Sequence, residues 1–142
     1  MIEFVAAAAA LVPFRTHEMT ADLPERPTEQ DYPYVVLWSD LGLEFSGDMP
    51  GWDDSLADLP DALELTLHAT YVGLSKEAVS ILARRTRAAL NRAVLDVEGW
   101  MCGPLRQAPL TGIEVDEAVQ IGQTHPYLAV DEYRLIATKE LT

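Results

Sequence analysis

The segment from Leu63 to Val97 constrains the fold most, because an alternating pattern, a tight turn and a helical pattern follow one another without interruption. Leucines at 63, 65 and 67 are followed by Ala69 and Tyr71, and the residues between them are mostly polar. A period of two is typical of a strand with one buried face. This stretch therefore predicts a strand that forms one wall of the core.

A long helix is expected to follow this strand. Gly73 permits the turn, and Ser75 is a typical N-cap whose hydroxyl accepts a backbone N–H. The helix is predicted to begin at Lys76 and to end at Val97, which gives it a length of roughly 33 Å at 1.5 Å per residue. On a helical wheel its core side holds Val79, Leu82, Ala83, Thr86, Leu90, Ala93, Val94 and Val97, and its outer side holds Arg84, Arg85, Asn91 and Arg92.

The length and composition indicate one domain spanning residues 1–142. Of the 142 residues, 49% are apolar, which is enough to bury a core without a disulfide or a structural metal. The single cysteine, Cys102, excludes an internal disulfide and a cysteine-rich zinc site, and we expect it to be a packed thiol. The apolar run Ile2–Val12 is too short to span a bilayer and carries no basic start, so neither a membrane anchor nor a signal peptide is expected.

Charge is distributed unevenly along the chain. The formal net charge of −13 divides into −12 for residues 1–75, +2 for residues 76–98 and −3 for residues 99–142. A negative field of this size repels nucleic-acid backbones. A sequence-specific DNA-binding or RNA-binding protein is therefore not expected.

The remaining patterns complete an α+β fold. We expect a short N-terminal helix over Ile2–Val12, a strand at Tyr34–Trp38 that is covered on both faces, a hairpin return near Leu43 and Phe45, a strand or half-strand over 113–121, and a last strand over 133–138. Gly99 is expected to cap the long helix. The predicted architecture is a mixed or antiparallel sheet of about four to five strands with the long helix and the short N-terminal helix packed on one side.

No catalytic, metal-binding or cofactor-binding motif stands out in the sequence. It contains no glycine-rich phosphate loop, His-Glu-x-x-His, Gly-x-Ser-x-Gly or Cys-x-x-Cys. The acidic stretch 40–61 lacks the ligand spacing of a calcium loop. His68 shares the polar face of its strand with Glu64, an arrangement that suits a general base beside a carboxylate, whereas a surface histidine with cross-strand bonds is the simpler interpretation. We therefore predict a non-enzymatic protein without a metal or cofactor.

A second apolar stripe on the long helix predicts a protein contact. Ile81, Ala88 and Leu95 are spaced by seven and lie between Arg84, Arg85 and Arg92, almost opposite the core side. Such stripes flanked by arginines serve protein–protein contacts, although single exposed apolar residues are also common. We hypothesise that this face meets the acidic stretch 40–61 of a second copy, where Asp48, Asp53, Asp54 and Asp58 provide carboxylates.

Taken together, these segments resemble the tail terminator (tail completion) proteins of long-tailed bacteriophages. The resemblance rests on 65–78, which reads Leu-Thr-Leu-His-Ala-Thr-Tyr-Val-Gly-Leu-Ser-Lys-Glu-Ala, and on its continuation through Leu82–Leu90. Supporting matches are Tyr34–Leu37 after a proline, Pro104-Leu105, His125-Pro-Tyr and Asp131–Leu135. The acidic loop after Trp38 and the short first helix depart from the family pattern.

The resemblance implies a structural role in the virion, at the neck region of the tail, after assembly in the host cytoplasm. It implies a homohexameric ring that caps the tail tube protein, ends tube polymerisation and meets a head-side connector protein. DNA would pass through the lumen without specific binding, and acidic side chains facing the lumen would favour that passage.

Three alternatives stay open at this point. Another neck component, such as a head-closure or adaptor protein, would share the location but bind a connector ring. A small α+β enzyme or binding domain would need a pocket at His68 and Glu64. An acidic protein of this size could also occupy a nucleic-acid site on a host partner.

Overall fold

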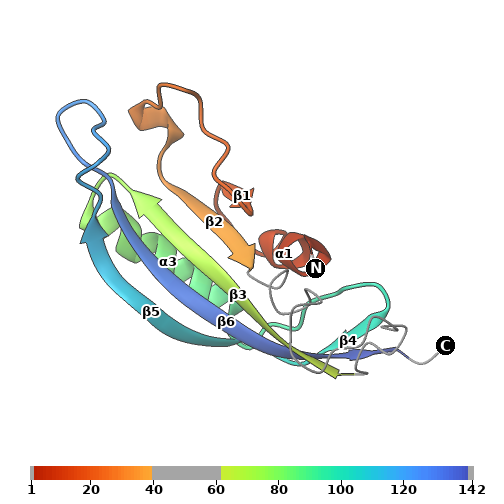
Figure 1. The fold of residues 1–142 in the computed structure, drawn as a ribbon. Coiled ribbons are helices and arrows are strands. Elements are labelled where there is room, and N and C mark those ends of the chain that lie inside the picture. The colour runs from red at the N-terminus through yellow and green to blue at the C-terminus, as the bar shows by residue number, and fades with distance from the viewer. Residues whose placement is uncertain (1, 40–61, 141–142) are drawn as a thin grey trace, which may run out of the picture.

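Strand β3 (Ala62–Gly73) lies inside a six-stranded mixed sheet in the computed structural model, which describes residues 2–39 and 62–140. The strand order is β1-β2-β3-β6-β4. Both β4 and β5 pair with the edge of β6 opposite β3, β4 near the end of β6 and β5 along its first part (Figure 1). Among the described strands, β1 and β2 run parallel and the other pairs are antiparallel. The other strands are β1 (Thr16–Glu18), β2 (Tyr34–Ser39), β4 (Trp100–Cys102), β5 (Arg106–Val115) and β6 (Tyr127–Lys139). The predicted α+β class is confirmed, and of the two predicted kinds of sheet, mixed or antiparallel, the described sheet is mixed.

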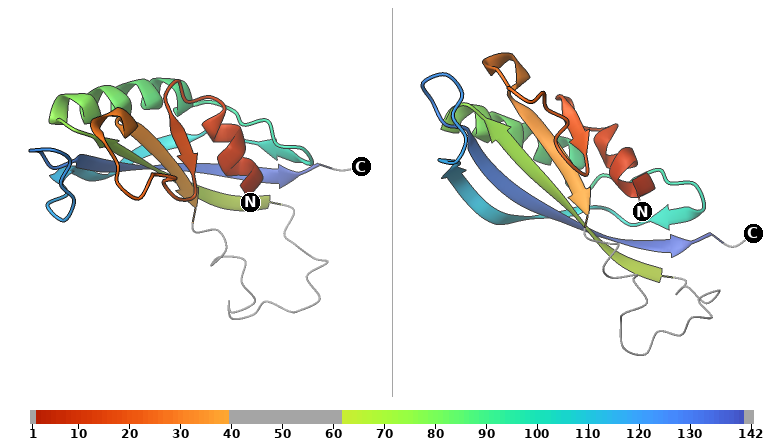
Figure 2. Two further views of the ribbon diagram at one scale, coloured as in Figure 1. Left: turned by 90° about the horizontal axis from the view of Figure 1, so that it is seen from above. Right: turned by 45° about the horizontal axis from the view of Figure 1, so that its top comes forward.

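In the described part of the chain, two α-helices cover one face of this sheet. Helix α1 (Ile2–Ala9) contributes Phe4, Val5 and Ala8 to the core, and helix α3 (Lys76–Leu90) contributes Val79, Leu82 and Leu90. Both helices lie on the same side of the curled sheet in Figure 2. The leucines of β3 at 63, 65 and 67 are at most 5% exposed and face these helices. A short 3-10 helix, η1 (Glu29–Asp31), precedes β2.

The turn from β3 into α3 follows the sequence prediction. The Ser75 hydroxyl accepts a hydrogen bond from the Ala78 backbone N–H at 3.0 Å, and the helix begins at Lys76. Gly73 lies so close to the first turn that a Cβ built on it would stand 3.0 Å from the Ala78 Cβ. A glycine is therefore needed here for close packing rather than for a left-handed conformation.

The predicted length of this helix is wrong, because α3 ends at Leu90 and not at Val97. Asn91 is the C-cap and Arg92 takes a positive φ of 68°, so the chain turns. The Arg92 N–H then donates to the Leu105 carbonyl, and the Leu105 N–H donates to the Ala93 carbonyl. This turn buries Leu95, which is 3% exposed, and leaves Val94 61% exposed, the reverse of the helical-wheel expectation. Helix α3 is therefore about 22 Å long.

Other expectations have mixed outcomes. The first helix ends at Ala9, three residues before the predicted end, and Gly99 forms a tight turn between Val97 and Trp100 at a φ of 85° instead of capping a helix. Strand β2 is covered on both faces as predicted, since Val35 and Leu37 join the main core while Tyr34 and Val36 form a second cluster with Val72. The closing strand is also confirmed: its core positions 133, 135 and 137 are buried and positions 134, 136 and 138 are exposed.

The predicted half-strand over 113–121 is only partly strand. Ile113 and Val115 belong to β5 and are 38% and 41% exposed, whereas Val119 and Ile121 lie in the connection to β6. The expected hairpin return at Leu43 and Phe45 lies outside the residues that the structure describes.

Candidate functional site

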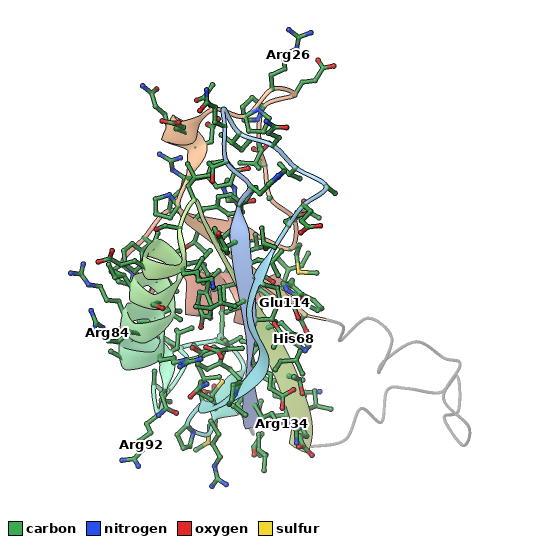
Figure 3. All side chains as sticks on the ribbon, turned by 90° about the vertical axis from the view of Figure 1, so that its left-hand side faces the viewer. Arg26, His68, Arg84, Arg92, Glu114 and Arg134 are labelled. Atoms are coloured by element: carbon green, nitrogen blue, oxygen red, sulfur yellow. The ribbon has the colours of Figure 1, made fainter. Side chains whose placement is uncertain are left out.

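The outer face of α3 exposes cationic side chains in a chain with a strongly negative charge. Arg84, Arg85 and Ala88 are exposed and Ile81 is partly exposed, and we call the surface that these four residues form the arginine face. Figure 3 shows Arg84 on the side of α3 that points away from the sheet. The Arg85 guanidinium stands 6.0 Å from the ring centroid of Phe14, which anchors it against the N-terminal segment. Arg84 has no ion-pair partner among residues 2–39 and 62–140.

Two members of the predicted contact stripe do not belong to this face. Leu95 is buried in the core beyond the end of the helix, so it is unable to take part in a surface contact. Arg92 is exposed but lies in the turn after Asn91, because the helix does not continue through it. The apolar part of the predicted stripe is thereby reduced to Ile81 and Ala88.

Arg87 is the helix arginine that the wheel analysis did not assign, and it points toward the sheet. Its Nε donates to Asp131 Oδ2 and its Nη2 donates to Asp131 Oδ1, both at 2.7 Å. Asp131 is 1% exposed, whereas the Arg87 side chain is 42% exposed. Hydrogen bonding to Asp131 raises the pKa of Arg87, despite the opposing effect of burial.

Two tyrosines complete this buried cluster between α3 and the sheet. The Tyr71 hydroxyl lies 2.6 Å from Asp131 Oδ2, to which it donates, and 3.0 Å from the Tyr133 hydroxyl. Burial is the main reason why the pKa of Tyr71 is raised and why the pKa of Tyr133 rises to about 12. One sequence signal could have identified the cluster: Asp131 occupies a core-facing position in the same alternation as Tyr133 and Leu135.

The sheet face opposite the helices carries an apolar groove of about 460 Å³ at one end of the molecule. It runs between the segment before β2 and the connection from β5 to β6. Aromatic and aliphatic side chains line most of it, including Leu23, Tyr32, Tyr34 and Val119, and Asp116 stands among them. Burial, followed by smaller effects that include the charge of Asp116, raises the pKa of Tyr32 and that of Tyr34, the latter to about 12.

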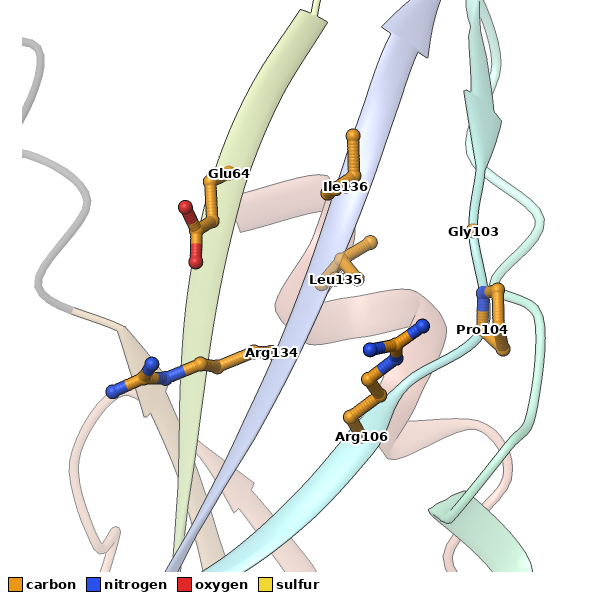
Figure 4. Close-up of a pocket in the computed structure, with 7 residues that line it drawn as sticks. All are labelled: Glu64, Gly103, Pro104, Arg106, Arg134, Leu135 and Ile136. Carbon is orange, nitrogen blue, oxygen red and sulfur yellow. The ribbon is translucent and has the colours of Figure 1, made fainter.

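A second groove of about 400 Å³ lies farther along the same sheet face. Glu64 from β3, Arg134 and Ile136 from β6 and Arg106 from β5 surround it, with Gly103 and Pro104 at its side (Figure 4). Arg134 is already paired with Glu132 at 3.1 Å. The opposite charges in this groove are mixed, so it presents no field of a single sign.

The structure does not bring His68 and Glu64 together as an acid–base pair. His68 is 7% exposed and stacks on Trp38, with ring centroids 4.1 Å apart and an interplanar angle of 16°. Glu64 is exposed in the second groove, four residues away on the same strand. The His68 Nδ1 atom has no hydrogen-bond partner among the described residues.

The predicted acidic site lies outside the described part of the chain. Asp48, Asp53, Asp54 and Asp58 all belong to the range 40–61, so their proposed contact has no structural description. Within residues 2–39 and 62–140, no group of three or more His, Cys, Asp or Glu side chains is placed to hold a metal ion.

In the described ranges, no helix has the length and apolar character needed to cross a membrane. No protein-family model matches the chain, and no curated protein matches it.

Proposed function

We propose that this protein is a structural subunit of a bacteriophage tail, which caps the tail tube as a homohexameric ring and meets the head-side connector protein. The sequence resemblance over 65–78 supports this proposal. Its residues form a continuous unit in the fold, from β3 through the Gly73 turn and the Ser75 cap into α3. This proposal assigns the chain no catalytic residue and no cofactor.

The observation that carries the proposal is the arginine face of α3. A closed ring needs a contact between two different surfaces of the same subunit, because a head-to-tail contact joins unlike patches. The inner side of α3 is filled by the core and by the Arg87–Asp131 pair, whereas Arg84, Arg85 and Ala88 are exposed on the outside. The formal charge of the subunit is −13, so most of its other charged groups are acidic. The cationic arginine face is electrostatically complementary to such an acidic surface on a neighbouring copy.

The test is to mix the purified chain with its tail tube protein, and to measure the mass of the particles by light scattering and their shape by negative-stain imaging. We expect a particle of about six times 15.7 kDa and tubes that stop growing with a ring at one end. Tubes that grow to the same length with and without the chain would contradict the proposal. Binding to the head-side connector without any effect on the tube would instead favour a head-closure or adaptor role.

A further inference from the structure

We infer that the apolar groove of about 460 Å³ receives the arginine face of α3 from a second copy of this chain. The inference rests on the proposed ring function and names the two surfaces of its subunit contact. It combines an apolar groove that has acidic neighbours with a helix face that is apolar in the middle and cationic at the sides.

The groove is built where two acidic segments meet. The 3-10 helix η1 carries Glu29 and Asp31, and the connection after β5 carries Asp116 and Glu117. These segments are adjacent, because the Glu29 Oε1 atom is 3.5 Å from the Cβ position of Gly122. Asp31 and Asp116 both act on the pKa of Tyr32, which lines the groove. Asp116 lines the groove, and Glu29, Asp31 and Glu117 belong to the same two segments. We call these four residues the acidic rim.

Two carboxylates of the acidic rim accept hydrogen bonds from backbone N–H groups, and the other two make no ion pair with the described residues. Asp31 Oδ2 accepts from the Thr28 N–H at 2.7 Å, and Asp116 Oδ1 accepts from the Ala118 N–H at 3.2 Å. Glu29 and Glu117 are exposed, and their carboxylates make no ion pair with any described residue. These two carboxylates are therefore the ones available to a cation from outside.

The arginine face has matching chemistry. Ile81 and Ala88 supply an apolar centre, and Arg84 supplies a guanidinium without an internal partner in the described chain. An amphipathic helix that lays its apolar residues into a groove while its charges meet the rim is a recurrent mode of recognition. Guanidinium groups bind carboxylates with two parallel hydrogen bonds, which fixes the orientation of the contact.

This pairing also satisfies the geometry of a head-to-tail assembly. The arginine face lies on the helix side of the sheet, and the groove opens on the opposite face at one end of the molecule. A subunit is therefore unable to fill its own groove with its own α3, so each copy offers one surface of each kind. Contacts of this type continue from copy to copy until the ring closes.

The test compares charge reversals by light scattering of the full chain, alone and with tube protein. We expect Arg84→Glu and the double change Glu29→Arg/Glu117→Arg each to raise the dissociation constant of self-association at least tenfold. A mixture of the two variants should assemble, because each restores a complementary partner for the other. The matched controls are Arg106→Glu and the double change Glu98→Arg/Glu140→Arg, which alter equal charges away from both surfaces.

A groove-filling variant tests the apolar part of the contact separately. Ala21 is exposed and lines the groove, so Ala21→Trp should occupy the groove without entering the core and should weaken association. Circular dichroism spectra identical to those of the unchanged chain would show that the variants are folded.

The outcomes separate this contact from the proposed function. Rings or tube caps that form equally well with Arg84→Glu and with Ala21→Trp would overturn the contact and leave the capping function standing. A chain that stays monomeric with and without tube protein would overturn the contact, and an unaffected tube in the same mixture would also contradict the function. Loss of assembly only in the groove and helix variants would support both.

Discussion

Arg87 on α3 and Asp131 on β6 form a two-point ion pair across the helix–sheet interface, with both N···O distances at 2.7 Å. The two residues are 44 positions apart in sequence, and Asp131 is almost completely buried. Tyr71 supplies a third hydrogen bond to the same carboxylate. The pair thus fixes the position of α3 on the sheet, and with it the direction in which the arginine face points.

Removing one partner of this pair should destabilise the fold strongly. Arg87→Met leaves the Asp131 carboxylate buried without its cation, which costs about 3–5 kcal/mol in comparable cases. Because the Arg87 side chain is 42% exposed, we expect a loss near the lower end of that range, measured by urea unfolding. The double change Arg87→Met/Asp131→Leu should lose less than the single change, because no unpaired charge remains. Arg84→Met is the exposed control, and an equal loss there would contradict the argument.

The turn between β3 and α3 should tolerate no added side-chain volume at Gly73. An alanine Cβ there would stand 3.0 Å from the Ala78 Cβ and 3.3 Å from Val79 Cγ2, and neither atom is the end of a long flexible chain. We expect Gly73→Ala to lower the free energy of unfolding by about 1–3 kcal/mol. Gly112→Ala is the matched control, because no atom lies within 4 Å of its Cβ position. Equal thermal midpoints for the two variants would refute the packing explanation.

Local patterns explain which parts of the fold could be predicted. The alternation on β3 and the Ser75 cap depend on residues that are close in sequence, and both are confirmed. The end of α3 depends on Leu105, which pairs with the backbone of residues 92 and 93 and thereby buries Leu95. A helical wheel contains no information about such a distant partner and therefore places Leu95 on the surface. The groove is not predictable from local patterns for the same reason, because its walls come from segments far apart in the chain.

The thiol of Cys102 should react more slowly than an ordinary exposed thiol. Burial, with a smaller effect of the Asp96 charge, raises the pKa of Cys102, and the thiolate is the reactive form. We expect the rate of alkylation by iodoacetamide at pH 8 to be well below that of the chain unfolded in urea. Asp96→Asn should increase the rate in the folded chain, because it removes a negative charge that disfavours the thiolate. Equal rates for folded and unfolded chains would show that Cys102 is not protected.

Tyrosine ionisation should make the fold sensitive to alkaline pH. The pKa values of Tyr34 and Tyr133 rise to about 12 and that of Tyr71 is also raised, mainly because burial disfavours the phenolate. An unfolded tyrosine has a pKa near 10, so the unfolded chain loses protons first as pH increases. The stability that these tyrosines provide is therefore complete below pH 10 and is lost between pH 10 and about pH 12.

At pH 11.5 we expect a loss of roughly 2 kcal/mol for each of Tyr34 and Tyr133, measured by urea unfolding. Tyr133→Phe should have a flatter dependence on pH, whereas Leu135→Ala, which deletes core volume without a titratable group, should be destabilised equally at every pH. A dependence that is unchanged in Tyr133→Phe would show that this hydroxyl does not control the alkaline transition.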